Sequence, residues 1–298
     1  MATTWPALPL DAWRATCDTL HAHTQVLGKF AVALGYPEPQ LQHAALRLTA
    51  RGWETAPLPA PDGSGALVVA LDLRAHEAVV DRTGGPTDRF PLVGRPVGQV
   101  TRELVRATGV QIDPTPQEVP WTVPLDEDAE HATYEPAQVE AYLAAATHAA
   151  LALAAYRAPY RGRATPVNAW WGSFDLAVNL FSGAPADPPS DDFIMRNAMD
   201  ATEVAVGLWP GDDRYPRPAF YGYAHPARPG FEEARLPGGG WNAELGEYVL
   251  DWDEAIAQDD PHAYVVAWCR ELFRHACVVC DWDPHLAGSA HGTPPPVR

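Results

Sequence analysis

The sequence predicts an α+β protein, built on a mostly antiparallel sheet or sheets with flanking helices, and three observations predict it. Segments rich in β-branched and aromatic residues follow one another without a helix between them, whereas parallel strands would need such crossovers. Longer segments with apolar residues three and four positions apart precede and follow them, which is typical of amphipathic helices. This order of helix, strands and helix occurs twice along the chain, so a duplicated unit would also fit.

The first half begins with a predicted helix over residues 10–34, whose apolar side chains recur at helical spacing. His21, Gln25 and Lys29 lie four residues apart, so they share one edge of this helix. Residues 35–44 are interrupted by prolines and are expected to form a loop. The next expected elements are strands at residues 45–51, 67–73, 78–82 and 110–113, with a helix at residues 97–108.

The second half begins with an alanine-rich helix predicted over residues 135–157, with Pro136 in its first turn, where no N–H is needed. The densest aromatic run, residues 170–183, lies mostly within one long predicted strand over residues 167–181. Asp260 followed by Pro261 predicts the start of a last helix, which runs to about Val279. Further strands are expected at residues 204–209, 219–224 and 247–250.

The chain is long enough for one large domain or two, and a chain of 298 residues buries about 75% of its unfolded surface. We expect one compact domain over residues 1–285. The proline-rich residues 114–134 are the best linker candidate, with possible halves 1–113 and 125–285. Residues 286–298 are expected to be a disordered tail.

The composition excludes several classes of function. A formal net charge of −17 repels phosphate backbones and anionic lipids, so neither nucleic acid nor a membrane surface is an expected partner. The sequence contains no run of about 18 apolar residues and no signal-peptide pattern. Three of the four cysteines lie in one helical segment, which is a poor disulfide framework, and this favours a cytoplasmic location.

In the predicted central strand, Trp171, Ser173, Asp175 and Asn179 would share one face, and the opposite face is apolar. The mixed face could be the floor of a pocket in which Asp175 acts as acid, base or ligand. Alternatively, the face is solvent-exposed and its carboxylate is paired for structural reasons.

Metal binding is considered at two places and expected at neither. Asp128 and His131 are three residues apart, a spacing that suits a metal on a helix, although acidic residues also stabilise a helix N-terminus. His275, Cys277, Cys280 and His285 are zinc-binding residue types, but the cysteine pair ends a helix, and buried apolar thiols are the simpler reading. No phosphate-binding glycine loop follows a strand, so no dinucleotide cofactor or P-loop is expected, and the cofactor is left open.

Other polar residues extend the candidate site. Tyr221, Tyr223 and His225 would share one face of a strand, where they could bind a planar or sugar-like ligand or form a half-buried sheet surface. Glu203 is one of several glutamates near strands, and two carboxylates at a suitable separation could hydrolyse a glycoside. The nucleophile elbow of serine hydrolases is not found. Lys29 is the only lysine, which indicates either biased composition or a role that arginine cannot fill.

Several motifs occur together in a characteristic order. They are Leu20-His21-x-x-Thr24-Gln25-x-x-Gly28-Lys29, Thr49-Ala50-Arg51-Gly52, Asp128-x-x-His131-x-x-Tyr134, Trp171-Gly172-Ser173-Phe174-Asp175-Leu176, Leu208-Trp209-Pro210-Gly211, Ala219-Phe220-Tyr221 and Glu244-Leu245-Gly246-Glu247. Over about residues 5–283 the chain resembles DUF5996, an uncharacterised bacterial family of unknown function, which implies no reaction, cofactor or partner. The family's pattern has histidines before the Thr-Ala-Arg-Gly motif and before Glu203, and arginines around the Phe-Ser-Gly segment. This chain has His43 as a candidate for the first, Thr202 directly before Glu203, and Asn179 and Ala184 in place of the arginines.

The sequence therefore predicts a small-molecule pocket beside the strand at residues 170–183, in a hydrolase-type enzyme that uses a carboxylate and a histidine. The predicted catalytic residues are Asp175, His131 and Glu203, and the predicted ligand-binding residues are His21, Gln25, Lys29, Trp171, Tyr221 and His225. The alternatives are a non-catalytic ligand-binding module and a protein-interaction module. The identity of the ligand and the oligomeric state are left open.

Overall fold

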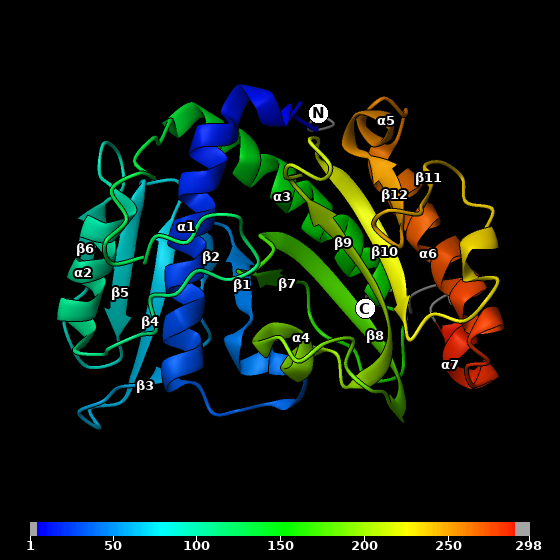
Figure 1. Ribbon diagram of the computed structural model, residues 1–298, viewed down its shortest axis with the longest axis horizontal. Coiled ribbons are helices and arrows are strands. Elements are labelled where there is room, and N and C mark those ends of the chain that lie inside the picture. Colours follow the sequence, from blue (N-terminus) through cyan, green and yellow to red (C-terminus); the bar gives the residue numbers. More distant parts are fainter. Residues whose placement is uncertain (1–4, 290–298) are drawn as a thin grey trace, which may run out of the picture. The chain divides into compact units, whose positions relative to one another are not determined.

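The computed structural model describes residues 5–289 (Figure 1). Its α-helices are α1 (Leu10–Leu34), α2 (Val97–Thr108), α3 (Pro136–Arg157), α4 (Phe193–Ala198), α5 (Trp252–Ile256), α6 (Pro261–Val279) and α7 (Pro284–Ser289), and its 3-10 segments are η1 (Pro39–Ala44) and η2 (Phe231–Glu233). Its strands are β1 (Leu46–Thr49), β2 (Gly52–Glu54), β3 (Leu58–Pro59), β4 (Ala66–Asp72), β5 (Glu77–Arg82), β6 (Asp88–Pro91), β7 (Asn168–Trp170), β8 (Asp175–Pro185), β9 (Ala201–Trp209), β10 (Ala219–His225), β11 (Gly240–Asn242) and β12 (Glu247–Asp251). The predicted α+β class is confirmed.

The contacts divide the described chain into two compact units. The N-terminal unit comprises residues 9–144 and 168–175, and the C-terminal unit comprises residues 5–8, 145–167 and 176–289. Helix α3 therefore begins in one unit and ends in the other. The predicted linker, residues 114–134, lies inside the N-terminal unit, where it has no helix or strand but buries Leu125 and Asp128. The single domain over residues 1–285 stays a prediction.

The N-terminal unit contains an antiparallel sheet in the order β7-β1-β2-β4-β5-β6, with β3 beside β4. Helix α1 packs on β4, α2 packs on β5 and β6, and the two helices contact each other (Figure 1). Leu20, Leu27 and Phe30 of α1 are buried, as are Val69 and Leu71 of β4, so the apolar stripe of the helix forms the core with the strands. Helix α2 ends where Gly109 adopts the left-handed conformation, with φ 71°.

The C-terminal unit contains a second antiparallel array, in the order β11-β12-β10-β9-β8. On one face of β9, Val204, Val206 and Leu208 are buried. Helix α6 covers β9 and β10, and a Cβ placed at Gly222 of β10 would lie 2.3 Å from the Leu272 side chain of that helix. A glycine at this point therefore lets α6 approach the sheet closely.

Three of the predicted helices have the expected boundaries, because capping and breaking residues define them. Helix α1 spans the predicted residues, α2 ends at Gly109, and the carboxylate of Asp260 caps α6 by accepting from the backbone N–H of Ala263. The strands predicted in the first half and after residue 200 correspond to β1, β4, β5, β9, β10 and β12, but residues 110–113 form no strand. The sequence reading missed the short elements β2, β3, β6, β11, α4 and α5, and η1 lies within the predicted loop at 35–44.

The long predicted central strand was wrong, since a turn divides it. Strand β7 ends at Trp170, β8 begins at Asp175, and Phe174 in the turn between them has φ 59°. Trp171 and Ser173 therefore lie in a turn and share no strand face with Asp175. Alternation of side chains cannot be extrapolated through a residue in the left-handed region.

Two further expectations concern the end of the chain and helix α3. Residues 286–289 of the expected disordered tail lie in α7, and residues 290–298 lie outside the described part of the chain. Helix α3 is long and apolar enough to cross a membrane by length and composition, and 44% of its most apolar window is buried. The core helix of a soluble protein has the same properties.

Candidate functional site

The turn between β7 and β8 lies against α1 through His21. The Nε2 atom of His21 is 3.0 Å from the carbonyl oxygen of Trp171 and 2.9 Å from that of Gly172. Because carbonyl oxygens only accept hydrogen bonds, Nε2 carries the proton. The imidazole also stacks on Phe174, with ring centroids 5.0 Å apart and planes 13° from parallel. His21 therefore fixes the conformation of the turn.

Gln25 binds the backbone of Gln117 with both ends of its amide, donating to the carbonyl at 2.8 Å and accepting from the N–H at 2.9 Å. One turn further along α1, Lys29 Nζ lies 3.5 Å from an Asp113 carboxylate oxygen and 5.3 Å from the centroid of the Trp171 ring. Burial lowers the pKa of Lys29, and Asp113 opposes this effect. The predicted ligand-binding residues of α1 thus hold loops of their own unit.

Asp175 is buried, with 5% of its surface exposed, so the alternative of a solvent-exposed carboxylate was wrong. The hydroxyl of Ser173 donates a hydrogen bond to its Oδ1 atom. Its sequence neighbour Phe174 lies between the rings of His21 and Tyr142, at centroid distances of 5.0 and 5.2 Å. Asp175 and His21 therefore belong to one packed cluster.

Asp128 and His131 form a paired carboxylate and imidazole. The Nδ1–H of His131 donates to Asp128 Oδ2 at 2.7 Å, and the other oxygen accepts from the backbone N–H groups of Glu130 and His131 at 2.9 and 3.0 Å. Burial alone would raise the pKa of Asp128, but these hydrogen bonds lower it. The same pairing raises the pKa of His131. The Nε2 atom of His131 makes no hydrogen bond to any residue of the described chain, and the side chain is 14% exposed.

The ring of Trp121 connects the two predicted histidines. It contacts His21 edge to face at 5.3 Å and His131 at 4.7 Å between centroids. His23, also on α1, is 1% exposed, burial lowers its pKa to about 4, and its Nε2 atom has no partner in the described chain. Sequence reasoning missed Trp121 because it lies in the proline-rich segment, and missed His23 because it lies away from the edge that carries His21.

Glu203 of β9 is a buried carboxyl of the C-terminal unit, and it is 1% exposed. Its carboxyl accepts from the Nδ2 group of Asn179 at 3.1 Å and from the hydroxyl of Tyr223 at 3.4 Å. Burial raises the pKa of Glu203 to about 8, and the hydrogen bonds from Asn179 and Tyr223 oppose this effect only in part. The Oδ1 atom of Asn179 is buried without a hydrogen-bond partner in the described residues.

The register of β9 and β10 places the predicted aromatic residues on the same face as Glu203. His225 lies directly opposite Glu203, Tyr223 opposite Ala205, and Tyr221 opposite Gly207. A Cβ at Gly207 would lie 2.5 Å from the Tyr221 ring, so this ring lies across β9. The two tyrosine rings stack at 6.2 Å, and His225 Nε2 is 3.0 Å from the carbonyl oxygen of Asp187. The predicted shared face of Tyr221, Tyr223 and His225 is therefore present.

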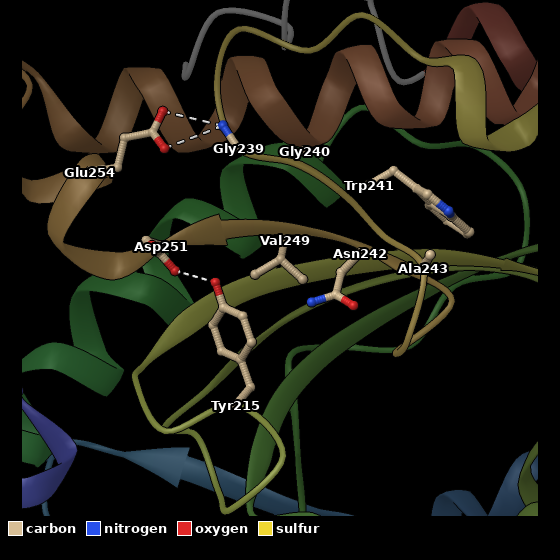
Figure 2. Close-up of a pocket in the computed structure, with 9 residues that line it drawn as sticks. All are labelled: Tyr215, Gly239, Gly240, Trp241, Asn242, Ala243, Val249, Asp251 and Glu254. Atoms are coloured by element: carbon tan, nitrogen blue, oxygen red, sulfur yellow. Dashed lines mark hydrogen bonds between the residues drawn. The ribbon is translucent and has the colours of Figure 1, made fainter.

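An open cleft of about 520 Å³ lies at the edge of the same array, beside β11 and β12 (Figure 2). Asp251 and Glu254 lie at one end of it in Figure 2, and Trp241 lies at the other. Asp251 accepts from the Tyr215 hydroxyl, and Glu254 accepts from the backbone N–H of Gly239. The lining residues are Tyr215, Gly239, Gly240, Trp241, Asn242, Ala243, Val249, Asp251 and Glu254.

The model of a family of unknown function, DUF5996, matches residues 5–288. The chain belongs to the DUF5996 family. No curated protein and no solved structure matches it. Membership of DUF5996 confirms the resemblance expected from the motifs but brings no reaction with it, so function has to be argued from the residues.

The predicted site residues of this DUF5996 chain fall into two groups. His21, Gln25, Lys29, His131, Trp171 and Asp175 belong to the N-terminal unit, and Glu203, Tyr221 and His225 belong to the C-terminal unit. Among residues 5–289, no three histidines, cysteines or acidic residues are grouped as a metal site. The four cysteines are buried and free, and burial raises their thiol pKa values.

Proposed function

We propose that this DUF5996 protein is a small-molecule enzyme of the hydrolase type, in which Glu203 is the proton donor. The observation that supports this proposal best is a buried carboxyl that forms no ion pair with a cationic side chain of residues 5–289. With a pKa of about 8, Glu203 is mostly protonated at pH 7 and can give its proton to a leaving group. Burying such a group costs stability, and strongly perturbed carboxyls are concentrated at functional sites.

The surrounding side chains fit this role. The Tyr223 hydroxyl lies 3.4 Å from Glu203 Oε1, and because a hydroxyl both donates and accepts, it can pass the proton from the buried carboxyl toward solvent. The stacked rings of Tyr221 and Tyr223 offer an apolar surface with polar edges, which suits a sugar-like or planar ligand. His225, opposite Glu203 in the register, is the proposed second acid–base group. The proposed partner is a small molecule, with no nucleic acid or membrane, and the proposed location is the cytoplasm.

The test is hydrolysis of alkyl glycosides, alkyl esters and alkyl phosphates, whose alkoxide leaving groups need a proton, by wild type and Glu203→Gln. Glutamine keeps the shape and the hydrogen-bonding capacity of the neutral acid but has no proton to give, so turnover should fall by about 100-fold or more while the fold is retained. Glu244→Gln, at an exposed position, is the matched control and should keep full activity. Turnover that survives in Glu203→Gln would refute the assignment.

The Nε2 atom of His131, which makes no hydrogen bond within the described chain, supports a second candidate function. A buried carboxylate that orients Nδ1–H leaves Nε2 with a lone pair, and this is the arrangement of a general base. In this second proposal the reaction takes place in the N-terminal unit. Trp121 and His21 would form a wall of the site beside His131, and Asp175 would be a second carboxylate in addition to Asp128.

The two candidates are separated by their pH profiles. A reaction that uses His131 as base should rise with pH through the raised pKa of this histidine, and Asp128→Asn should move that inflection to lower pH. His131→Gln should abolish turnover, whereas the exposed His285→Gln should not. If turnover depends on neither Glu203 nor His131, both catalytic assignments fail. If wild type turns over none of these substrates, the non-catalytic binding module is the alternative function.

A further inference from the structure

The open cleft beside β11 and β12 has space over one glycine in particular. A Cβ built at Gly240 has no atom within 4 Å, whereas a Cβ at the neighbouring Gly239 would lie 2.1 Å from the carbonyl oxygen of Val249. The cleft is therefore bounded by packed backbone at Gly239 and open at Gly240. A side chain introduced at Gly240 therefore meets no neighbouring atom at its Cβ and can extend into the cleft.

The polar groups of the cleft are mainly hydrogen-bond acceptors. Asp251 accepts from the hydroxyl of Tyr215 and, at 3.1 Å, from the Arg217 guanidinium. Glu254 accepts from Gly239 and from the hydroxyl of Tyr264 at 3.0 Å. An ionised carboxylate has about four acceptor positions, so both groups retain capacity for more donors. Asn242 uses its oxygen to accept from the N–H groups of Glu244 and Leu245, which leaves its NH₂ group as a donor.

The charge of the cleft favours a cation. The cleft has two carboxylates, Asp251 and Glu254, and the Arg217 guanidinium pairs with Asp251, which gives a formal charge of −1 in a protein with a net charge of −17. The aromatic face is not available to a quaternary ammonium, because the Arg217 guanidinium already lies 5.2 Å from the centroid of the Tyr215 ring. The Trp241 ring packs against Tyr248 at 5.2 Å. A cation bound here has to be recognised by its N–H donors.

We propose that the cleft lined by Gly240, Asn242, Asp251 and Glu254 binds a primary ammonium group of a small organic amine. The ammonium donates to the free acceptor positions of Asp251 and Glu254, and the side chain of the amine lies along Val249 over Gly240. This site is independent of Glu203 and of His131. The cleft is open, so the affinity rests on a few charge-assisted hydrogen bonds and falls with added salt.

The experiment is a titration of the full chain with putrescine at low ionic strength. Binding is measured by calorimetry and by the shifts of the NMR signals of Gly240 and Asn242. Wild type should bind with saturation. Gly240→Phe fills the cleft without changing the charge, so it should weaken binding by about tenfold or more, whereas diffuse attraction to an acidic protein would be unaffected. Glu254→Gln should also weaken binding by about tenfold. Asp259→Asn removes one exposed charge outside the cleft and should leave binding unchanged.

A matched ligand completes the test. Tetramethylammonium has the charge but no N–H donor and should bind at least about tenfold more weakly than putrescine. The proposal is overturned if wild type shows no saturable binding, if Gly240→Phe and Glu254→Gln bind putrescine as wild type does, or if tetramethylammonium binds equally well.

Discussion

The protonation of Glu203 predicts an unusual dependence of stability on pH. In the folded chain its pKa is raised from 4.5 to about 8, while in the unfolded chain it has the ordinary value. Between these two values the native state holds a proton that the unfolded state has released. The free energy of unfolding therefore has its full contribution from this group below pH 4.5, and it falls as the pH rises toward 8.

The magnitude follows from the width of that window. Each pH unit changes the free energy of a one-proton difference by about 1.4 kcal/mol, so the group removes about 5 kcal/mol of stability between pH 4.5 and pH 8. This is a large part of the ~5–15 kcal/mol that stabilises a typical domain. Glu203→Gln has no titratable group at this position, so the contribution of residue 203 becomes independent of pH.

The assay is urea denaturation of wild type and Glu203→Gln at a series of pH values from about 4 to 9, with the free energy of unfolding extrapolated to water. The two profiles should be closest in acid and should separate progressively above pH 4.5, with wild type the less stable protein at pH 8. Glu244→Gln, at an exposed site, should follow wild type throughout. Profiles of wild type and Glu203→Gln that stay parallel would show that the carboxyl is ionised in the folded chain, and the proton-donor role would fail with it.

Three further predictions test the packing and the second pair. Gly28→Ala should destabilise the protein by about 1–3 kcal/mol, because the new Cβ would lie 2.1 Å from the Trp171 indole, and urea denaturation measures this. Gly98→Ala should destabilise the protein at least as much, because its Cβ would lie 2.8 Å from backbone atoms of Asp128. Gly240→Ala places its Cβ in open space and should change stability by less than about 1 kcal/mol. Asp128→Asn should lower the pKa of His131 in an NMR titration and remove the stability that this pair gives below the raised pKa of the histidine, and an unchanged titration would refute the pairing.

Much of the fold could be predicted because local chemistry determined it. Gly109 ends α2 in the left-handed conformation, the Asp260 carboxylate caps α6, and Pro136 starts α3, so each boundary has one residue that explains it. The short strands were missed because three residues such as Gly240–Asn242 are too few for a periodic pattern, and pairing with β12 is what makes them a strand. The turn at Phe174 was missed for a related reason. A phenylalanine with φ 59° is stabilised by stacking on His21 and Tyr142, which are remote in sequence.

The candidate site was predictable as a set of residues but not as an arrangement. The spacing of His21, Gln25 and Lys29 correctly predicted that they share one edge of α1. Their partners, however, are backbone groups and an aspartate in loops that have no periodic sequence pattern. Trp121 is the clearest example of a residue whose placement could not be predicted from the sequence. Its position between His21 and His131 depends on how residues 114–134 pack onto the N-terminal unit, and proline content alone suggested a linker.

The buried carboxyls of Asp128 and Glu203 illustrate why function here has to be inferred from the surroundings of a residue rather than from its type. Asp128 accepts two backbone N–H groups and an imidazole N–H, so its ionised form is favoured and it can orient a base. Within residues 5–289, Glu203 accepts hydrogen bonds from a side-chain amide and a phenol alone, so burial dominates and it keeps its proton at pH 7. In the two proposed functions, the carboxyl of Glu203 is therefore an acid, and the carboxylate of Asp128 orients a base. Each assignment depends on neighbours that are distant in sequence, and the single substitutions Glu203→Gln and Asp128→Asn test them separately.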